Sequence, residues 1–531
     1  MTLPPAPKPL SLPVFRALWV ATIISNVGTW MHDVGAGWLM TSLSAEPLMV
    51  ALVQAATTLP MFLLALPGGA LADIVDRRKL LLGAQVLSLI GAALLAATTL
   101  LGLTSPLILL GFTAIIAIGA ALSAPAFQAI VPELVPAPAL QQAVALNSLG
   151  VNISRAIGPA LGGVVIAAAG PAAVFALNSL SVVAVLWVLL RWQRETPEQH
   201  LPPEHFVGAL RAGLRYALRA PDLQMVLIRS IGFFLFASAL WALLPIVARR
   251  DLGLGPAGYG ALLTAMGLGA IAGALLLPHL RGRLSGNALT LAASLLLAFS
   301  MVALALSASF WPAAAALAIA GLSWIAMMSA LNGGAQAASP GWVKARALAI
   351  YLLVFQGAMT AGSTLWGALA GRIGVAPALE LAALALAIAT PLLAWLFPLG
   401  RSASPDLSPS MHWPMPVVEG EAAPDAGPVM VTVEYRIDPA RMADFQRAMK
   451  PMQRIRRRDG AIHWGLYEDA AAPGVVVESF VVESWLEHLR QHHRITKDDR
   501  AVQDAARAFH MGKDVPLVRH LISPATRLRP A

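Results

Sequence analysis

The sequence predicts an all-α membrane protein with twelve transmembrane helices in two six-helix repeats, followed by a small α+β domain. Two observations carry this prediction. The chain of 531 residues is 57% hydrophobic and only 12% charged, whereas soluble domains carry about 25% charged residues. The charge is also unevenly placed, because 30 charged residues lie in the first 400 positions and 35 in the last 131. The first part therefore suits lipid and the second part suits water.

Apolar stretches of about 20 residues, enough to cross the hydrocarbon core of a bilayer, predict the twelve helices. A polar stretch from Arg191 to Asp222 separates six of them from the other six. We expect spans at 15–41, 47–70, 80–102, 106–130, 140–168 and 172–190, then at 223–247, 257–279, 287–308, 312–337, 346–370 and 376–397. The expected domains are thus one bundle at 1–192, a cytoplasmic loop at 193–222 and a second bundle at 223–400.

Loop cations predict that both termini lie in the cytoplasm, because cytoplasmic loops of membrane proteins carry an excess of Lys and Arg. With the N-terminus inside, the inner loops receive Lys8, Arg16, Arg77, Arg78, Lys79, Arg191, Arg194, Arg211, Arg215, Arg219, Arg281, Arg283, Lys344 and Arg346. The outer loops receive only Arg249, Arg250 and Arg372, of which the adjacent pair goes against the rule. The net charge of +9 then comes from cations that flank the membrane. We therefore expect an inner-membrane protein without a nucleic-acid partner.

The two predicted halves repeat each other at an offset of 204 residues. This shift carries Gly28, Gly69, Leu71, Arg77, Gly158, Leu161 and Gly163 onto Gly232, Gly273, Leu275, Arg281, Gly362, Leu365 and Gly367. Two six-helix halves related by an internal repeat are typical of a transporter with its substrate path between the halves. A small-molecule substrate is the partner that this organisation predicts.

The last part of the chain predicts a separate soluble domain. Residues 401–428 are rich in Pro, Ser and small residues, which favours a linker. Beyond it, alternating apolar residues predict strands at 429–436, 461–467, 474–483 and 515–522, and helical periods predict helices at 439–457 and 485–509. The order βαββαβ is that of a ferredoxin-like unit, expected at 429–523.

The segment between the second and third predicted spans carries the strongest local motif. It resembles the loop motif of the major facilitator superfamily, G-x-L-x-D-x-x-G-R-[RK], through Gly69, Leu71, Asp73, Arg77 and Arg78. Asp76 departs from that pattern, because it stands where the superfamily has glycine, and Ile74 replaces the usual cation. The resemblance predicts the fold of that superfamily.

The same motif predicts a gating role. Gly69 and Asp73 lie one helical turn apart, so that the glycine allows close helix approach while the carboxylate sits at the interface. Such a carboxylate holds an arginine or a helix N-terminus in one conformation and releases it in the other. Simple anchoring of the loop by its cations explains Arg77 and Arg78 but not the Gly/Asp spacing. The second-half copy has Leu277 in place of the acid, which predicts that only the first half makes this gating contact.

A second motif, Gly158-Pro159-Ala-Leu-Gly162-Gly163, lies in the fifth predicted span. It resembles the G-P-x-x-G-G stretch of antiporters and exporters in the same superfamily. Proline bends the helix and frees a carbonyl, and the glycines let a neighbouring helix pack closely. Small-residue packing alone is common in membrane helices, but this position within the fifth of twelve spans favours export.

Three ionisable residues interrupt the predicted spans: Asp33, Arg155 and Arg229. Charges inside a bilayer are expensive and usually face a polar cavity or one another. We therefore expect Asp33 to be the proton site and Arg155 to interact with it or to receive an anionic group of the substrate. The alternative for Asp33 is a water-exposed residue near the outer end of its span. Arg229 is expected to snorkel to the inner interface in a structural role, and His32 to be a packed polar residue.

Amide side chains complete the predicted pathway. The candidates are Asn26, Asn152 and Gln356, together with Gln54, Asn147, Asn332 and Gln336. Because amides also hold membrane helices together, a structural role is equally open for each of them. The indoles of Trp30, Trp38, Trp241, Trp324 and Trp366 suit either an aromatic substrate or the interfacial belts where Trp is enriched.

Together, three segments and the predicted tail resemble the transmembrane secretion effector branch of the superfamily, which is related to the enterobactin exporters. The segments are Ser25–Met31, Leu71–Lys79 and Ser154–Gly163, and the resemblance covers essentially the whole chain. It implies export of a small molecule, such as a siderophore, a drug or another metabolite. With Asp33 as the expected proton site and two six-helix bundles, we expect this export to be proton-coupled and to work by alternating access. Uptake by the same fold is the alternative within transport.

The predicted soluble tail resembles small dimeric α/β-barrel domains, some of which are monooxygenases. Its candidate polar groups are His463, Trp464, Tyr467, His488, His492 and His493. They form no recognisable nucleophile–base pair, metal spacing or cofactor loop, so we expect regulation or dimerisation, no cofactor and no enzymatic activity. A membrane-tethered enzyme that acts through this tail is the alternative from another class. The absence of cysteine excludes thiol chemistry, and the absence of a Walker loop argues against ATP drive.

Overall fold

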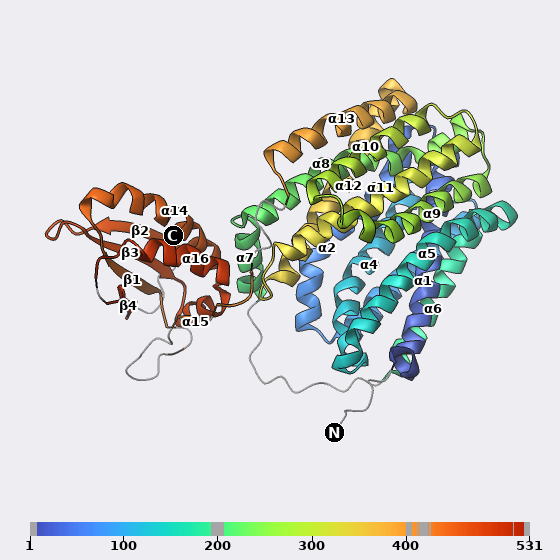
Figure 1. Ribbon diagram of the computed structural model, residues 1–531. Coiled ribbons are helices and arrows are strands. Elements are labelled where there is room, and N and C mark those ends of the chain that lie inside the picture. The colour runs from blue at the N-terminus through green and yellow to red at the C-terminus, as the bar shows by residue number, and fades with distance from the viewer. Residues whose placement is uncertain are drawn as a thin grey trace. The chain divides into compact units, whose positions relative to one another are not determined.

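The computed structural model describes residues 8–192, 206–399, 406–410, 412–413, 423, 426–512 and 514–524. These fall into two compact units. The membrane unit consists of the described residues within 1–202, 226–333 and 351–399, and the soluble unit consists of those within 203–225, 334–350 and 400–531. Figure 1 shows a helical membrane unit and a soluble unit that contains the one sheet of the described chain.

Twelve long helices occupy the positions of the predicted spans. The first bundle holds α1 (Pro13–Leu43), α2 (Pro47–Ile74), α3 (Arg77–Leu100), α4 (Pro106–Leu134), α5 (Leu140–Ala169) and α6 (Pro171–Arg191). The second holds α8 (Pro221–Ile246, extended by η3, Val247–Asp251), α9 (Pro256–Arg281), α10 (Gly286–Ala305), α11 (Phe310–Ala337), α12 (Lys344–Ile373) and α13 (Val375–Leu396). Proline in the first turn starts several of them, including α1, α2 and α9, because its fixed φ suits that position.

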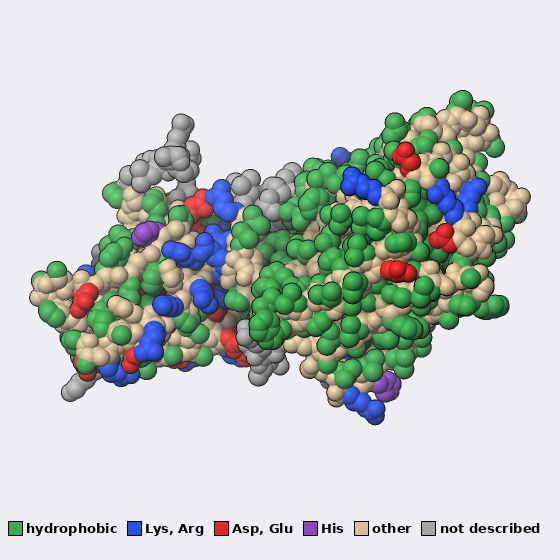
Figure 2. All heavy atoms as spheres, turned by 90° about the horizontal axis from the view of Figure 1, so that it is seen from above, with side chains coloured by type: hydrophobic (Ala, Val, Ile, Leu, Met, Phe, Trp, Pro, Cys, Tyr) green, Lys and Arg blue, Asp and Glu red, His purple; other side chains and the backbone are tan. Residues whose placement is uncertain are grey.

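Within the described chain, eleven of these helices are long and apolar enough to cross a membrane. The exception is α1, which has the length of 31 residues but carries Asn26, His32 and Asp33 in its middle. It nevertheless packs against α5 and α6 inside the first bundle. Figure 2 shows that hydrophobic side chains cover most of the visible surface of the membrane unit, as expected for helices that face lipid.

The internal repeat appears as matched glycine contacts. A Cβ on Gly158 of α5 would meet the Val27 carbonyl of α1 at 3.2 Å, and a Cβ on its repeat partner Gly362 would meet the Leu235 carbonyl of α8 at 2.3 Å. Because glycine has no side chain, the backbones of α5 and α12 approach α1 and α8 in the same way. The offset of 204 residues is thus expressed in the packing of both bundles.

The soluble unit has the predicted βαββαβ order. Its strands are β1 (Val429–Arg436), β2 (His463–Glu468), β3 (Val475–Val482) and β4 (Leu517–Ile522), in the sheet order β2-β3-β1-β4 with every pair antiparallel. Its helices are α14 (Met442–Asp459), preceded by the short η4 (Pro439–Arg441), then α15 (Trp485–Arg494) and α16 (Lys497–Arg507). Buried apolar residues of β1, β3 and α14 form its core.

The single helix predicted at 485–509 is wrong, because the chain breaks at Ile495 and Thr496. Thr496 begins α16 with a capping box, in which its hydroxyl accepts from the Asp499 amide at 3.2 Å and the Asp499 carboxylate accepts from the Thr496 amide at 2.9 Å. These reciprocal hydrogen bonds satisfy amides that a new helix leaves unpaired. The capping box therefore favours the start of a new helix, α16, where we expected one helix to continue.

The predicted cytoplasmic loop at 193–222 contains a further helix, α7 (Phe206–Ala217), while residues 193–205 lie outside the described chain. This helix belongs to the soluble unit. Arg215 of α7 pairs with Glu487 of α15 at 3.2 Å, and Glu487 also pairs with Arg494 at 2.5 Å. Tyr216 donates a hydrogen bond to the Ala338 carbonyl at 2.7 Å. We call the three residues of the two ion pairs, Arg215, Glu487 and Arg494, the α7–α15 cluster.

Candidate functional site

A central cavity of about 290 Å³ lies between the two six-helix bundles of the membrane unit. The first bundle contributes α1, α2 and α5 to its wall, and the second contributes α8, α9, α11 and α12. Four residues of the predicted pathway line it: Asp33, Gln54, Arg155 and Gln356. Residues far apart in the sequence, from both halves of the repeat, therefore meet at one polar site.

Arg155 is held in this cavity by aromatic packing. Its guanidinium carbon lies 5.5 Å from the ring centre of Trp30, a distance at which a cation and an indole attract each other. The Nε atom of Arg155 is buried and has no hydrogen-bond partner in the part of the chain that the structure describes. No ion pair joins Arg155 to Asp33 among the described residues, so the cation keeps donors for a bound molecule.

Aromatic rings form the second chemical feature of the cavity. Trp30, Trp241, Trp324, Phe355 and Tyr259 all line it. Trp324 packs against Trp241 with ring centres 5.5 Å apart. A cation and a carboxylate surrounded by such rings suit a substrate that is both aromatic and charged.

The candidate tryptophans divide into two groups. Trp30, Trp241 and Trp324 line the central cavity. Trp366 instead donates its indole N–H to the Leu235 carbonyl at 2.9 Å, and Trp38 stacks on Tyr259 with ring centres 6.0 Å apart. The sequence analysis missed Phe355 and Tyr259, since single aromatic residues in apolar spans carry no signal of their own.

Five of the seven candidate amides do not line the central cavity: Asn26, Asn147, Asn152, Asn332 and Gln336. Asn26 lines a different cavity, inside the first bundle. Asn152 is exposed and donates to the Ser148 carbonyl of its own helix at 2.9 Å, so its expected place in the pathway is wrong in this conformation. Gln54 joins Gln356 in lining the central cavity.

Arg229 does not snorkel to the interface. It is only 4% exposed and donates to Asn287 Oδ1 at 2.7 Å and to Thr290 Oγ1 at 2.5 Å. Asn287 Oδ1 also accepts from the Leu399 amide at 2.8 Å. Arg229 thus links α8 to α10 and to the end of the second bundle. Arg229 thus has a structural role, as expected, but its guanidinium is solvated by side chains inside the protein and not by water at the interface. His32 is buried and packs on Phe175 with ring centres 5.0 Å apart.

The loop motif fastens helices within the first bundle. Arg77 donates to Glu133 Oε1 of α4 at 2.7 Å, and Arg78 donates to the carbonyls of Leu189 and Leu190 at the end of α6 at 2.7 Å each. Asp76 caps α3 by accepting from the Lys79 amide at 2.9 Å. An N-cap favours aspartate over most residues, which accounts for its place in the motif.

The close helix approach expected at Gly69 is wrong. A Cβ on Gly69 would meet nothing within 4 Å, whereas a Cβ on the neighbouring Gly68 would lie 3.3 Å from the Ala121 carbonyl of α4. Successive residues of a helix point about 100° apart, so only one of two adjacent glycines faces a given neighbour. The side chain of Asp73 lies outside the described part of the structure.

The Gly-Pro motif of α5 lies where three helices meet. A Cβ on Gly162 would lie 3.1 Å from the Cα of Met31 in α1, and one on Gly163 would lie 2.7 Å from the Pro256 carbonyl of α9. Pro159 lies inside the helix, and its carbonyl faces Gly260 of α9. The motif therefore permits contact between the two bundles.

Arg249 and Arg250, the pair that went against the cation rule, fasten one bundle to the other. Arg249 donates to Thr41 Oγ1 at 3.0 Å and to Ser42 Oγ, both at the end of α1. Arg250 donates to the Ala45 carbonyl at 2.6 Å. A cation beside the carboxyl end of a helix is favoured by the helix dipole. No local pattern predicts this contact, since the partners lie more than 200 positions apart in the chain.

Trp464, His488 and His492 serve the packing of the soluble unit, whereas His463 and Tyr467 are exposed. Trp464 donates to Glu478 Oε1 at 3.0 Å, and Glu478 is buried against Arg456 at 3.0 Å. His488 and His492 pack with ring centres 5.0 Å apart, and burial lowers the pKa of His488 to about 3. Within the described residues no group of three His, Cys, Asp or Glu is placed to hold a metal. The side chain of His493 is outside the described part.

One family model covers nearly the whole length of the chain, while the curated relatives cover half of it. A model of the transmembrane secretion effector family matches residues 5–528. The enterobactin exporters EntS of Citrobacter koseri and of Shigella boydii serotype 18 are each 31% identical to it over 274 residues. Each alignment covers 50% of this chain and 62% of the exporter, so the chain spans less than two thirds of the length of these relatives.

Solved structures share the fold at low sequence identity. A POT family transporter in complex with 5-aminolevulinic acid has a TM-score of 0.61 at 14% identity, covering 72% of this chain and 96% of its own. A bacterial homologue of the human lysosomal transporter Spinster, inward-facing and unoccupied, has a TM-score of 0.58 at 15% identity, covering 72% and 97%. All four of these proteins are described as exporters or transporters.

The family match includes both the helical part and the soluble unit. The twelve-helix arrangement in two repeats agrees with the fold of the transporters above. The chain therefore belongs to the transmembrane secretion effector family of the major facilitator superfamily, in its enterobactin-exporter-like branch, and is a multi-pass protein of the inner membrane.

Proposed function

We propose that the protein exports an anionic aromatic small molecule across the inner membrane in exchange for protons, by alternating access. The observation that carries this proposal is the central cavity, where Asp33 and Arg155 face a space lined by both bundles. A carboxylate and a cation placed at the interface of two repeats are where a secondary transporter binds its proton and its substrate.

The packing of the bundles supports alternating access. They meet at the end of the membrane unit that holds the α1–α2 and α8–α9 connections, through Arg249 and Arg250 and through Gly163 of α5 against α9. A third contact, the hydroxyls of Thr58 and Thr360 at 2.7 Å, joins α2 to α12. In this conformation the protein is closed at that end, and opening there requires these contacts to break.

Loop cations support an orientation with both termini in the cytoplasm. The end at which the bundles meet is then periplasmic, and the structure is closed towards the periplasm. The Gly-Pro motif of α5 supports export over uptake, through its likeness to the motif of exporters and through its place at the contact between α5 and α9.

The chemistry of the cavity supports an aromatic anion as the substrate. Arg155 retains donors for an anionic group, and Trp30, Trp241 and Trp324 offer ring faces. The relatives EntS are named as exporters of enterobactin, which makes enterobactin the first substrate to test, together with other siderophores and drugs. Growth of a deletion strain against a panel of toxic compounds, with efflux measured, identifies the class.

Proton coupling is tested by Asp33→Asn in proteoliposomes that contain a pH-sensitive dye and carry an imposed pH gradient. We expect this variant to lose gradient-driven transport of the substrate found in the panel and the proton flux that accompanies it, because an amide carries no titrating proton. Glu46→Gln, at an exposed helix cap, is the matched control and is expected to transport normally. Unchanged transport and proton flux in Asp33→Asn reject the assignment.

For the soluble unit we propose two roles, regulation and dimerisation. The α7–α15 cluster supports regulation, since it ties the sheet domain to α7, which precedes the second bundle in the chain. The uncovered face of the sheet supports pairing with a second copy. Met430, Val481 and Leu521 lie side by side on three strands, and Met430 and Leu521 are 39% and 49% exposed. A shared apolar row of this kind is self-complementary about a two-fold axis.

A further inference from the structure

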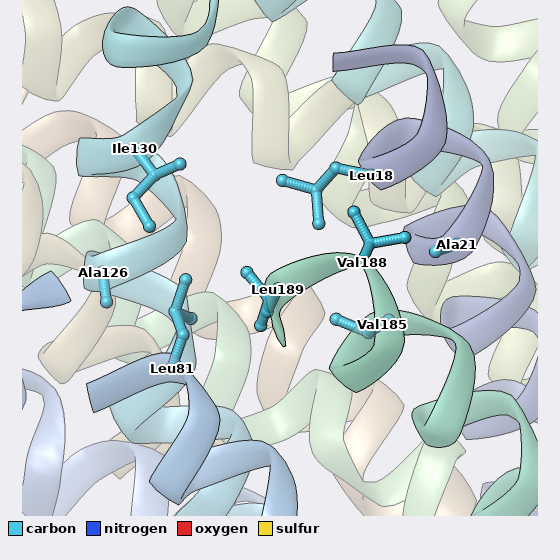
Figure 3. Close-up of a cluster of buried hydrophobic side chains, with 8 residues drawn as sticks. All are labelled: Leu18, Ala21, Leu81, Ala126, Ile130, Val185, Val188 and Leu189. Carbon is cyan, nitrogen blue, oxygen red and sulfur yellow. The ribbon is translucent and has the colours of Figure 1, made fainter. Parts of the chain in front are cut away.

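A second cavity, of about 690 Å³, lies inside the first bundle. Its walls come from α1, α3, α4, α5 and α6, and it shares no lining residue with the central cavity. Three aliphatic side chains line one end of it: Leu81, Val185 and Leu189. They belong to a buried cluster in which, as Figure 3 shows, the side chains of α4 face those of α1 and α6. The volume is within the range of about 300–1,000 Å³ that is usual for small-molecule sites.

The chemistry of this cavity differs from that of the central one. Its lining contains many hydroxyl groups and the amides Asn26, Gln85, Gln128, Asn147 and Asn178, but no charged side chain. Polar side chains inside a membrane bundle are expensive to bury, and they usually face one another or a polar cavity. So many uncharged donors and acceptors around one space indicate a ligand that offers the same kind of groups.

Two buried polar atoms of the wall lack partners in the described chain: Asn178 Oδ1 and Thr22 Oγ1. Asn178 is only 2% exposed. A buried acceptor without a hydrogen bond costs free energy. Asn178 Oδ1 lies beside Gly28 of α1, so it gains a donor from a ligand only when the side chain turns towards the cavity. Trp19 lines the same cavity, and its indole N–H donates to the Leu146 carbonyl at 2.9 Å. That bond fixes the ring and leaves its faces for packing.

We propose that this cavity binds an uncharged molecule rich in hydroxyl groups, of the class of aromatic glycosides. Hydroxyls of the ligand meet the amide and hydroxyl groups of the wall, and an apolar ring meets Trp19 and the aliphatic end. An ionic ligand finds no countercharge here and is excluded by its loss of hydration. This site goes beyond the proposed transport function, since it is independent of Asp33 and Arg155.

Equilibrium binding of radiolabelled 4-nitrophenyl β-D-glucoside to the full chain in lipid nanodiscs tests the proposal. We expect saturable binding and a Kd about tenfold higher in Asn147→Leu and in Asn178→Leu, since each loses a hydrogen bond to the ligand. Asn147 is half-buried, so its variant keeps the test valid if the deeply buried Asn178→Leu does not fold. Asn152→Leu, an exposed amide on the same helix, is the matched control.

The outcomes separate clearly. Weaker binding in the two cavity variants, with binding unchanged in Asn152→Leu and in Asp33→Asn, supports the site and shows that it is distinct from proton coupling. Binding that is absent up to about 10 mM, or equal in Asn147→Leu and wild type, overturns the site. Competition by 4-nitrophenyl phosphate as strong as by the unlabelled glucoside overturns the exclusion of charged ligands.

Discussion

In the proposed transport function, substrate binding depends most on the contact between Arg155 and Trp30. The guanidinium lies over the indole face, and this geometry uses the planar, delocalised cation that lysine lacks. Because Arg155 Nε has no partner in the described chain, its interactions with substrate are added to the cation–π contact.

We expect Arg155→Lys to raise the substrate concentration for half-maximal transport by about three- to thirtyfold, since cation–π pairs contribute about 0.5–2 kcal/mol. The measurement is initial efflux in proteoliposomes. A double-mutant cycle with Trp30→Leu is the control, because residues that act together are not additive. If the losses of the two single variants add up to that of the double variant, the two residues do not act together in binding substrate.

His488 predicts how pH acts on the soluble unit. Burial and the neighbouring His520 and His492 lower its pKa from 6.5 to about 3. Below pH 6.5 the imidazole of His488 therefore binds a proton in the unfolded chain, whereas in the folded chain it stays neutral down to about pH 3. Stability is at its full value above pH 6.5 and falls as the pH drops towards 3.

Hydrogen exchange of residues 485–494 measures this effect in the full chain. After correction for intrinsic rates, we expect faster exchange at pH 5 than at pH 7.5. His488→Phe, which packs a ring without a titrating group, is expected to reduce the difference. A difference as large in His488→Phe as in wild type argues that other groups cause it.

At the scale of the elements, the sequence was most informative about helices and repeats. Apolar length located the twelve helices, and the offset of 204 residues predicted matched contacts that Gly158 and Gly362 make. The break before α16 was missed although Thr496 and Asp499 carry a capping signal, because the apolar period continued across it. In the soluble tail, the ends of the four strands were predicted to within two residues.

The site was predicted less completely, for a geometric reason. Asn147 and Asn152 are five residues apart and so point about 140° from each other on a helix, and only Asn147 lines a cavity. For the same reason, adjacent Gly68 and Gly69 point in different directions, and only Gly68 faces α4. Contacts such as Arg249 with Thr41 depend on how the halves pack, which no local pattern reports.

The approach of α5 to α9 predicts the effect of added volume. A Cβ on Gly163 would lie 2.7 Å from the Pro256 carbonyl, so Gly163→Ala forces the helices apart, at a cost of about 1–3 kcal/mol. We expect the bundles to open at this end and labelling of an introduced Cys at Gly37 to accelerate. Gly83→Ala, where a Cβ meets nothing within 4 Å, is the control. Equal labelling in both variants contradicts the packing argument.

The α7–α15 cluster gives a prediction for the soluble unit. Arg494 pairs with Glu487 at 2.5 Å and packs over Trp342 at 4.7 Å, so Arg494→Gln removes contacts to both. We expect faster hydrogen exchange in residues 211–217 and 338–343. Arg500→Gln, an exposed pair with Asp504, should leave both segments unchanged. Exchange unchanged in Arg494→Gln argues that the cluster does not hold α7.

At the scale of the whole molecule, the proposed carrier has two bundles that meet at one end of the membrane unit. The polar groups of the central cavity are tolerated because they border a space shared by both bundles. The contacts at the closed end include hydrogen bonds of Arg249 and Arg250 and close approaches at glycine, which suit an interface that breaks and re-forms. The chain contains no cysteine, which lets introduced labels report on each end without a background.

The distance between the bundles at both ends of the membrane unit tests the central claim most directly. Spin labels at Leu103 and Ser307 report on the closed end, and labels at Lys79 and Leu284 report on the opposite end. Alternating access predicts that proton or substrate binding lengthens the first distance and shortens the second, and that Asp33→Asn removes the response to pH. Two distances that stay fixed, or that change in the same direction, would contradict the account.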